Sequence, residues 1–393
     1  RIGPSSRRNA SATLARMNRR TLRVAATFAV AALLPCALVL GATPASAANV
    51  SFRVSPVAAW RLNGVGYATT VVGNTVYVGG TFTTATSPSG QTVARANLAA
   101  FDATTGALRT GFVANTNGAV RSLASDGTRL FVGGSFTTIG GQSRSRLAAV
   151  NPSTGAVDTG WTANASSHVY ALSVGGGRLY AGGSFSTISS TSRSRIAALN
   201  LTNRTLVTSF NASANGTVLA VAATPDGSAV YAGGDFSQVN GANQPNLAKF
   251  NSSGASIAMS WASLQGNVLA LSVRPDGTRL AVAQGGAGNQ GSYYNTSTGA
   301  RLWRQRCGGD AQGIWLIEDT MFTGFHDECD GNTALKLTSN ATSNGARNNF
   351  RPTFDRYWGV RAIGGNSNVL VIAGDFTRVN GVAAQGFAIF RRA

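Results

Sequence analysis

Residues 120–157, VRSLASDGTRLFVGGSFTTIGGQSRSRLAAVNPSTGAV, contain the pattern that decides the fold. Two short apolar runs, VRSLAS and LFVGGSF, are separated by Asp126-Gly127. Asp-Gly between apolar runs is a strong β-hairpin signal, because both residues tolerate a positive φ. A polar loop leads to a third run, LAAVN, and the turn PSTG leads to a fourth that ends near Trp161. The stretch therefore predicts four short antiparallel strands.

The same pattern returns along the chain at intervals of about 50 residues. The first small residue of the repeated glycine pair falls at Gly79, Gly133, Gly182, Gly233, Ala283, Gly324 and Ala373. Seven modules cover nearly all of residues 50–393, the fifth and sixth copies are degenerate, and no convincing helical periodicity is present. Four antiparallel strands repeated seven times predict an all-β fold, a seven-bladed β-propeller of four-stranded antiparallel blades.

Packing and closure of this ring can also be predicted. Paired small residues let neighbouring sheets approach closely, and the recurring aromatic residues are expected to fill the space between blades. The last module, which ends in GFAIFRRA, supplies three strands at most. Residues 52–63, FRVSPVAAWRLN, have the pattern of a spare fourth strand, with Trp60 in the place of Trp161. We expect this N-terminal strand to complete the last blade and close the ring, which removes exposed edges.

The first 47 residues have the pattern of an export signal. Met17 opens a basic stretch, an apolar run follows from Val24 to Leu40, and Ala45 and Ala47 stand at the −3 and −1 positions of a cleavage site. We assign 1–16 to an upstream extension that is non-native or untranslated, 17–47 to a signal peptide and 48–393 to a single propeller domain. A membrane anchor is the competing interpretation, disfavoured because Pro35 interrupts the apolar run.

Charge and cysteine content narrow the classes of partner. Residues 1–47 hold seven arginines and no acid, so the net charge of +19 falls to +12 for the mature chain. A basic chain favours acidic partners such as wall polymers or anionic glycans, and a solvated basic surface without a dedicated partner is the alternative. No recognisable nucleic-acid-binding motif accompanies the charge, so we expect no nucleic acid partner. Cys307 and Cys329 remain after cleavage, and an even count in an exported chain predicts one disulfide, with a metal site as the alternative.

The phrase FVGGSFTTIGG, followed by LAAVNPSTGAV and Trp161, resembles the delta-60-type, kelch-like repeat of exported β-propellers, especially those of actinobacteria. The resemblance covers about 340 residues and implies a propeller in a secreted or wall-associated protein. It implies little about activity, because propellers host many functions. Some relatives carry a late repeat of the form GD-Q…GGHF…C. This chain matches it at Gly309, Asp310, Gln312, Gly324, His326 and Cys329, and departs from it at Phe325 and Asp327.

Two sets of residues are candidates for a site. The first is expected at the entrance to the innermost strands, facing one mouth of the central channel: Tyr67, Arg121, His168, Tyr170, Asp310, Gln312, Trp358 and Arg361. Aromatic rings with Arg, Asp and Gln suit a sugar or peptide ligand, and variable rim residues without a ligand are the alternative. The second is the polar cluster His326, Asp327 and Glu328 in the degenerate sixth module. With Asp310 it suggests either an acid–base or metal cluster, or a repeat held by the disulfide and a His–Asp bond.

These features predict a secreted or cell-wall-associated, monomeric binding or scaffold module for an extracellular glycan, a cell-wall polymer or a protein. We expect no cofactor, no bound metal, no membrane span in the mature chain and no catalysis. The alternative is a propeller enzyme acting on polysaccharide at one channel mouth, either a lyase or a glycoside hydrolase. Hydrolases usually work with paired carboxylates, and the sequence has no obvious pair, whereas a lyase built on tyrosine, arginine and His168 stays open.

Overall fold

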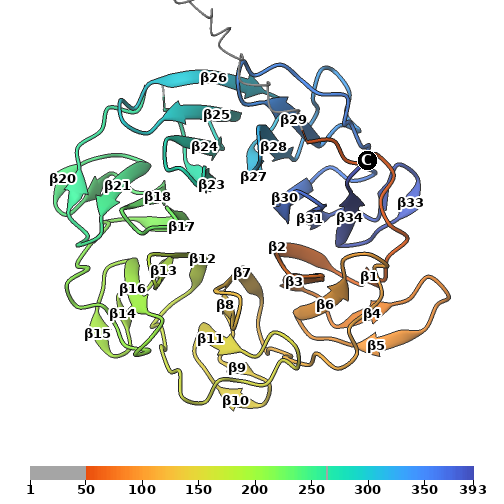
Figure 1. Ribbon diagram of the computed structural model, residues 1–393, viewed down its shortest axis with the longest axis horizontal. Helices are drawn as coiled ribbons and strands as arrows, with labels where there is room; N and C mark the ends of the chain where they lie inside the picture. The colour runs from red at the N-terminus through yellow and green to blue at the C-terminus, as the bar shows by residue number, and fades with distance from the viewer. Residues whose placement is uncertain (1–49, 263) are drawn as a thin grey trace, which may run out of the picture. The chain divides into compact units, whose positions relative to one another are not determined.

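The computed structural model describes residues 50–262 and 264–393, and every regular element among them is a β-strand (Figure 1). This confirms the all-β prediction. The extension 1–16, the signal peptide 17–47 and the cleavage site lie outside the described residues. Within the described part of the chain, no helix could cross a membrane.

Seven antiparallel sheets carry the repeats in the described residues, each with three or four strands. The first four sheets in chain order are β2 (Val65–Val72), β3 (Thr75–Thr81) and β6 (Leu98–Asp102); β7 (Val120–Ser125), β8 (Leu130–Gly134) and β11 (Leu147–Val150); β12 (Val169–Gly175), β13 (Arg178–Gly183) and β16 (Ile196–Asn200); and β17 (Thr217–Ala223), β18 (Ala229–Asp235), β21 (Leu247–Asn251) and β22 (Ser256–Ile257). The last three are β23 (Val268–Val273), β24 (Arg279–Gln284), β25 (Gln290–Asn295) and β26 (Arg301–Arg306); β27 (Ala311–Ile317), β28 (Thr320–Phe325) and β29 (Leu337–Ala341); and β30 (Gly359–Asn366), β31 (Val369–Asp375) and β34 (Phe387–Arg391).

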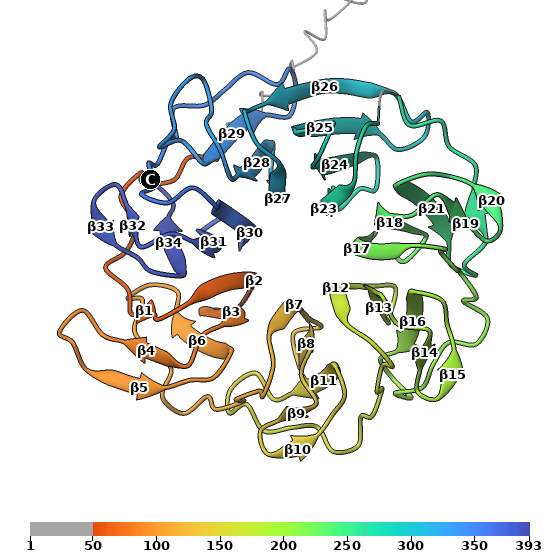
Figure 2. The same ribbon diagram turned by 180° about the vertical axis from the view of Figure 1, so that it is seen from behind.

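The first strand of each sheet lies innermost around a common centre (Figures 1 and 2). Each innermost strand contacts the innermost strand of the next sheet, from β2 through β30, and β30 contacts β2 again. Among the described residues, two of these seven sheets have a fourth strand. In most of the others a single bridge takes its place, for example Phe101 with Leu108 and Val150 with Val157. The chain therefore forms a ring of small sheets around a channel.

The glycine pair sets the fit between sheets. A Cβ added to Gly133 would meet the Val169 side chain at 2.8 Å, and one added to Gly182 would meet Val218 at 2.5 Å, in each case on the next innermost strand. In the last sheet the position is Ala373, and it faces Gly66 instead of a valine. The larger residue in the glycine-pair position, Ala373, thus faces the smaller residue on the neighbouring innermost strand, Gly66. Dense packing requires this compensation.

The polar loops after the glycine phrase contain short hairpins that the repeat pattern did not predict. They are β4 (Thr84–Thr86) and β5 (Thr92–Ala94); β9 (Thr138–Ile139) and β10 (Gln142–Ser143); β14 (Thr187–Ile188) and β15 (Thr191–Ser192); β19 (Gln238–Val239) and β20 (Ala242–Asn243); and β32 (Arg378–Val379) and β33 (Val382–Ala383). The short strand β1 (Arg61–Leu62), which precedes β2, pairs with β4. Arg146 and Arg195 follow two of them, and their guanidiniums donate to the carbonyls of Ala165 and Ala214, both at 3.0 Å. Part of the basic charge therefore serves the fold.

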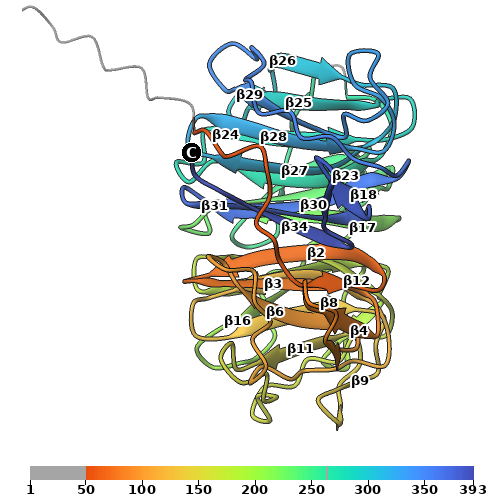
Figure 3. The same cartoon turned by 90° about the vertical axis from the view of Figure 1, so that its right-hand side faces the viewer.

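The N-terminal segment lies beside the last sheet. The backbone N–H of Arg53 donates to Arg391 O at 2.9 Å, and that of Val57 donates to Ile389 O at 2.8 Å. The side view shows this segment passing β34 before the chain enters β2 (Figure 3). The ring of Phe52 is buried against Phe322, with the two centroids 5.7 Å apart. These contacts connect the first described residues to the last two sheets.

Candidate ligand-binding site at the channel mouth

A β-bulge near the start of every innermost strand produces the rim of the channel. In all seven sheets the register between the first two strands shifts by one residue opposite the glycine phrase. The residues left without a partner are Tyr67, Arg121, Tyr170, Leu219, Leu269, Gln312 and Arg361. A bulge re-aims one side chain and bends the strand. All of these residues except Gln312 line the cavity of the central channel, so the bulge places one side chain per sheet at a common mouth.

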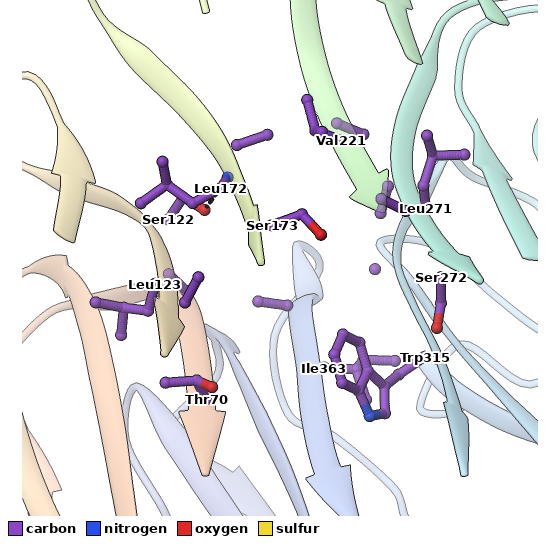
Figure 4. Close-up of a pocket in the computed structure, with 18 of the residues that line it drawn as sticks. Thr70, Ser122, Leu123, Leu172, Ser173, Val221, Leu271, Ser272, Trp315 and Ile363 are labelled. Atoms are coloured by element: carbon purple, nitrogen blue, oxygen red, sulfur yellow. Dashed lines mark hydrogen bonds between the residues drawn. The ribbon is translucent and has the colours of Figure 1, made fainter. Parts of the chain in front are cut away.

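Below the mouth the channel wall is made mostly of aliphatic and small hydroxyl side chains, with the indole of Trp315 among them, around a cavity of about 480 Å³ (Figure 4). Two of the serine hydroxyls join neighbouring sheets. Ser122 Oγ accepts a hydrogen bond from Leu172 N at 2.8 Å, and Ser272 Oγ accepts one from Leu316 N at 3.1 Å. These serines therefore have a structural role, and the charged side chains that line this cavity, Arg121 and Arg361, lie at the mouth.

Two arginines share the ring of Tyr67. The guanidinium carbon of Arg121 lies 4.2 Å from the ring centroid, and that of Arg361 lies 5.7 Å from the same centroid. Cation–π contact of this kind holds a guanidinium in place while leaving its N–H groups available to a ligand. Within residues 50–262 and 264–393, neither arginine forms an ion pair with a carboxylate. The pair therefore presents two positive charges at one side of the mouth.

Arg361 continues this contact chain to the sixth sheet. Its guanidinium carbon lies 5.2 Å from the Trp358 ring centroid, and the Trp358 ring lies 5.2 Å from that of His326. Tyr357 packs on the same imidazole at 5.3 Å, and Gln312 Nε2 lies 3.5 Å from its Nδ1. The structure therefore brings His326 and the rim residues of the last two sheets into one cluster, although the sequence placed them in two sets.

The environment of His326 favours its neutral form. Burial lowers the pKa of its imidazole, the nearby charges of Asp310 and Asp327 oppose that shift, and Lys336 and Arg361 add to it. Asp310 Oδ2 is 3.9 Å from Nδ1, which is too long for a hydrogen bond. A neutral imidazole keeps one ring nitrogen as an acceptor, so it can take a hydrogen bond or a proton from a ligand.

The remaining predicted residues lie at the edges of this cluster. His168 is exposed just before β12, and its Nδ1 is 3.0 Å from the hydroxyl of Tyr170. Asp327 and Glu328 make local hydrogen bonds: Asp327 Oδ1 accepts from the backbone N–H of Glu328 at 2.9 Å, and the backbone carbonyl of Asp327 accepts from Lys336 Nζ at 2.7 Å. Of the polar cluster, His326 is thus the member that contacts the mouth residues. Within the described residues, no three His, Cys, Asp or Glu side chains are grouped to hold a metal ion.

The predicted disulfide between Cys307 and Cys329 is confirmed, with Cα atoms 4.6 Å apart. It joins the segment that leads to Asp310 with the segment that follows His326. The backbone N–H of Gly308 donates to Glu328 O at 2.7 Å between the same two segments. Phe325 replaces the second glycine of the repeated glycine pair, yet β28 still includes this residue. The bulge at Gln312 is also present, as in the other six sheets. The degenerate repeat is therefore both fastened by a disulfide and part of the mouth.

The sequence analysis missed Tyr357 and Lys336 as members of the cluster around His326. It also did not predict that His326 and the channel-mouth residues lie together. Tyr357 is 54% exposed beside Trp358, and the Lys336 ammonium lies 5.7 Å from the Tyr357 ring. The position of His326 could have been predicted from the antiparallel pairing of the first two strands in its repeat. In an antiparallel pair, the residue after the second strand lies beside the start of the first strand. His326 follows β28, so it had to lie near the start of β27, where Asp310 and Gln312 are.

Comparisons with known proteins agree on the architecture. A family model described as "Domain of unknown function (DUF5122) beta-propeller" matches residues 124–160 and 224–255, which lie in the second and fourth repeats. No curated protein matches the chain. A chain in the solved structure described as "Crystal Structure of Mitotic Checkpoint Complex" is 16% identical, with a TM-score of 0.58 over 87% of this chain and 96% of that one. Because 1359 chains of solved structures match, the likeness identifies a fold and no single function. The chain is a β-propeller repeat protein.

Proposed function

We propose that this chain is a secreted, monomeric, seven-bladed propeller with delta-60-type, kelch-like repeats, closed by its N-terminal strand. Seven sheets whose innermost strands contact one another in a closed cycle support the blade number. The backbone hydrogen bonds from Arg53 and Val57 to β34 support closure, because they hold the N-terminal segment along the free edge of the last sheet. The Cys307–Cys329 disulfide supports export, because disulfides persist in oxidising compartments.

We propose further that the propeller is a binding module whose ligand, an extracellular glycan or a protein, occupies the channel mouth. One observation carries this: Arg121 and Arg361 are held against Tyr67 without a carboxylate partner among the described residues. Unpaired guanidiniums beside exposed aromatic rings are typical of a recognition surface, whereas guanidiniums that serve only the fold are bonded to carbonyls, as Arg146 is.

A polysaccharide lyase is the second candidate. The neutral imidazole of His326 shares a cluster with Arg361 through Trp358, and a lyase needs a base close to a cation that neutralises an acidic sugar. This combination favours a lyase over a glycoside hydrolase, for which two carboxylates must flank the scissile bond. Ultraviolet absorbance of unsaturated products, measured after incubation with acidic polysaccharides, tests it. A lyase requires that signal to grow with time and to disappear in the His326→Gln variant.

The binding proposal is tested by an array of extracellular glycans and proteins. The wild-type chain is compared with the Arg121→Ala/Arg361→Ala double variant and with Arg304→Ala. Arg304 is an exposed arginine on β26, so its replacement changes the charge away from the mouth. We expect the double variant to lose the bound targets and Arg304→Ala to retain them. Equal binding by all three proteins would exclude the channel mouth as the site.

A further inference from the structure

We infer that the ligand of the mouth is an acidic polysaccharide, whose sugar carboxylates are bound by Arg121 and Arg361. This inference rests on the proposed function and names its ligand class. The two guanidinium carbons lie 4.2 and 5.7 Å from one ring centroid, so their separation is at most the sum of these distances. A planar guanidinium binds a carboxylate through two parallel hydrogen bonds. Two such groups around one ring fit a ligand that carries repeated carboxylates.

The electrostatic surroundings favour an anion at this place. Lys336, the other cation of the cluster, donates to Asp327 O and is within reach of the charges of Asp327 and Glu328. Asp310 has its Oδ1 bound to Gly286 N at 2.7 Å. Asp327 and Glu328 thus lie near Lys336, and Asp310 is bound to the backbone of Gly286. Among the described residues, none of these three carboxylates forms an ion pair with Arg361. An arriving carboxylate would therefore meet guanidiniums that no described acid neutralises.

Exposed aromatic rings beside the arginines favour a sugar over a simple anion. Trp358 is 45% exposed and Tyr357 is 54% exposed, and their ring centroids are 5.3 Å apart. The apolar face of a pyranose ring packs on aromatic rings of this kind. Because the guanidinium of Arg361 lies 5.2 Å from the Trp358 ring, a sugar packed on Trp358 would have its carboxylate near Arg361.

An acidic peptide fits this surface less well. Extended peptides are bound by adding a strand to a sheet edge or by lying in a continuous groove. At this mouth Tyr67, Arg121 and Arg361 come from separate innermost strands, one bulged residue from each, and the bulge interrupts the hydrogen-bonding register at that point. In the part of the chain that the structure describes, the mouth therefore offers separate charged and aromatic contacts and no extended backbone edge.

Isothermal titration calorimetry with four probes tests this inference. The probes are a short oligogalacturonate, its carboxyl-reduced neutral counterpart, a sulfated galactan fragment and a polyglutamate peptide of similar charge. We expect the oligogalacturonate to bind, with an affinity that falls as salt rises, and carboxyl reduction to weaken binding at least tenfold. Arg121→Ala and Arg361→Ala should each weaken binding by about tenfold, as expected for a charge-assisted pair of hydrogen bonds. Arg304→Ala should stay within about twofold, because it removes an equal charge away from the mouth.

The outcomes separate the inference from the proposed function. If polyglutamate binds, needs both arginines, and the oligogalacturonate does not bind, the acidic-sugar ligand is wrong and the mouth remains the site. If the sulfated fragment binds more tightly than the oligogalacturonate, the group that the arginines recognise is a sulfate and the carboxylate inference is wrong. If Arg304→Ala weakens binding as much as Arg361→Ala does, the attraction is general charge, and both proposals fail. Unchanged melting temperatures in all variants establish that the proteins compared are folded.

Discussion

The guanidinium of Arg121 lies 4.2 Å from the ring of Tyr67, although the two residues belong to neighbouring sheets and are separated by one whole repeat. Both are bulged residues of innermost strands, β7 and β2. The bulge recurs in every sheet, so adjacent sheets present equivalent side chains side by side at the mouth. The bulged residue of each repeat therefore contributes to the mouth, together with neighbours such as Trp358 and His326, while most of the repeat maintains the ring.

The close fit at the first glycine predicts a stability effect. Gly182→Ala should lower the free energy of unfolding by about 1–3 kcal/mol, because the added Cβ would overlap Val218 and Val221. Gly111→Ala is the matched control: no atom outside its chain neighbours lies within 4 Å of its added Cβ, and it should change little. Urea denaturation measures both. A second change, Val218→Ala, should recover part of the loss in Gly182→Ala, and independent effects of the two changes would contradict the packing account.

The N-terminal segment offers a test of ring closure. Phe52 is 2% exposed and packs edge-on against Phe322 and Phe350. Phe52→Ala should therefore lower the free energy of unfolding by about 3–5 kcal/mol, as for a large aromatic residue removed from a core. Val54→Ala, at a residue that is 39% exposed, should have a small effect. A melting temperature unchanged by Phe52→Ala, or by deletion of residues 50–61, would show that this segment does not close the ring.

The disulfide should contribute to stability and to the shape of the mouth. It closes a loop with a sequence separation of 22 residues. Replacing both cysteines by serine should lower the free energy of unfolding by about 3 kcal/mol on the chain-entropy model. Guanidinium denaturation of the wild type and the double variant, each with and without reductant, measures this difference. Reductant should destabilise the wild type only, and an equal response of both proteins would count against the disulfide.

His326 should make stability depend on pH. Burial holds the pKa of its imidazole below the ordinary value of 6.5, so the folded state binds this proton less readily than the unfolded state. Stability should therefore be unaffected by this group above pH 6.5 and should fall as the pH drops through the folded pKa. NMR titration of the imidazole gives that pKa directly. The His326→Gln variant should lose this part of the acid sensitivity, and a folded pKa above 6.5 would refute the assignment.

Much of the architecture could be predicted from the sequence, because the repeat is local. Hairpin turns, the spacing of the glycine phrase and the pair Cys307 and Cys329 identified strands, a ring of sheets and the disulfide. The fourth strands were less predictable. In the second sheet, residues after the turn PSTG form only the bridge between Val150 and Val157, because Trp161 then enters the core and the chain leaves the sheet. The short hairpins such as β9–β10 have too few residues for a periodic pattern.

The sequence by itself determined the repeat, and with it one position per module that reaches the mouth, occupied by Tyr67, Arg121 and Arg361 among others. Only the tertiary structure decided which of these side chains meet. Tyr67 belongs to the first sheet and Arg361 to the last, and they touch because the ring returns to its start. His326 joined the same cluster because β28 ends beside the start of β27. Both contacts depend on closing a chain of sheets in space, which no local pattern of residues specifies.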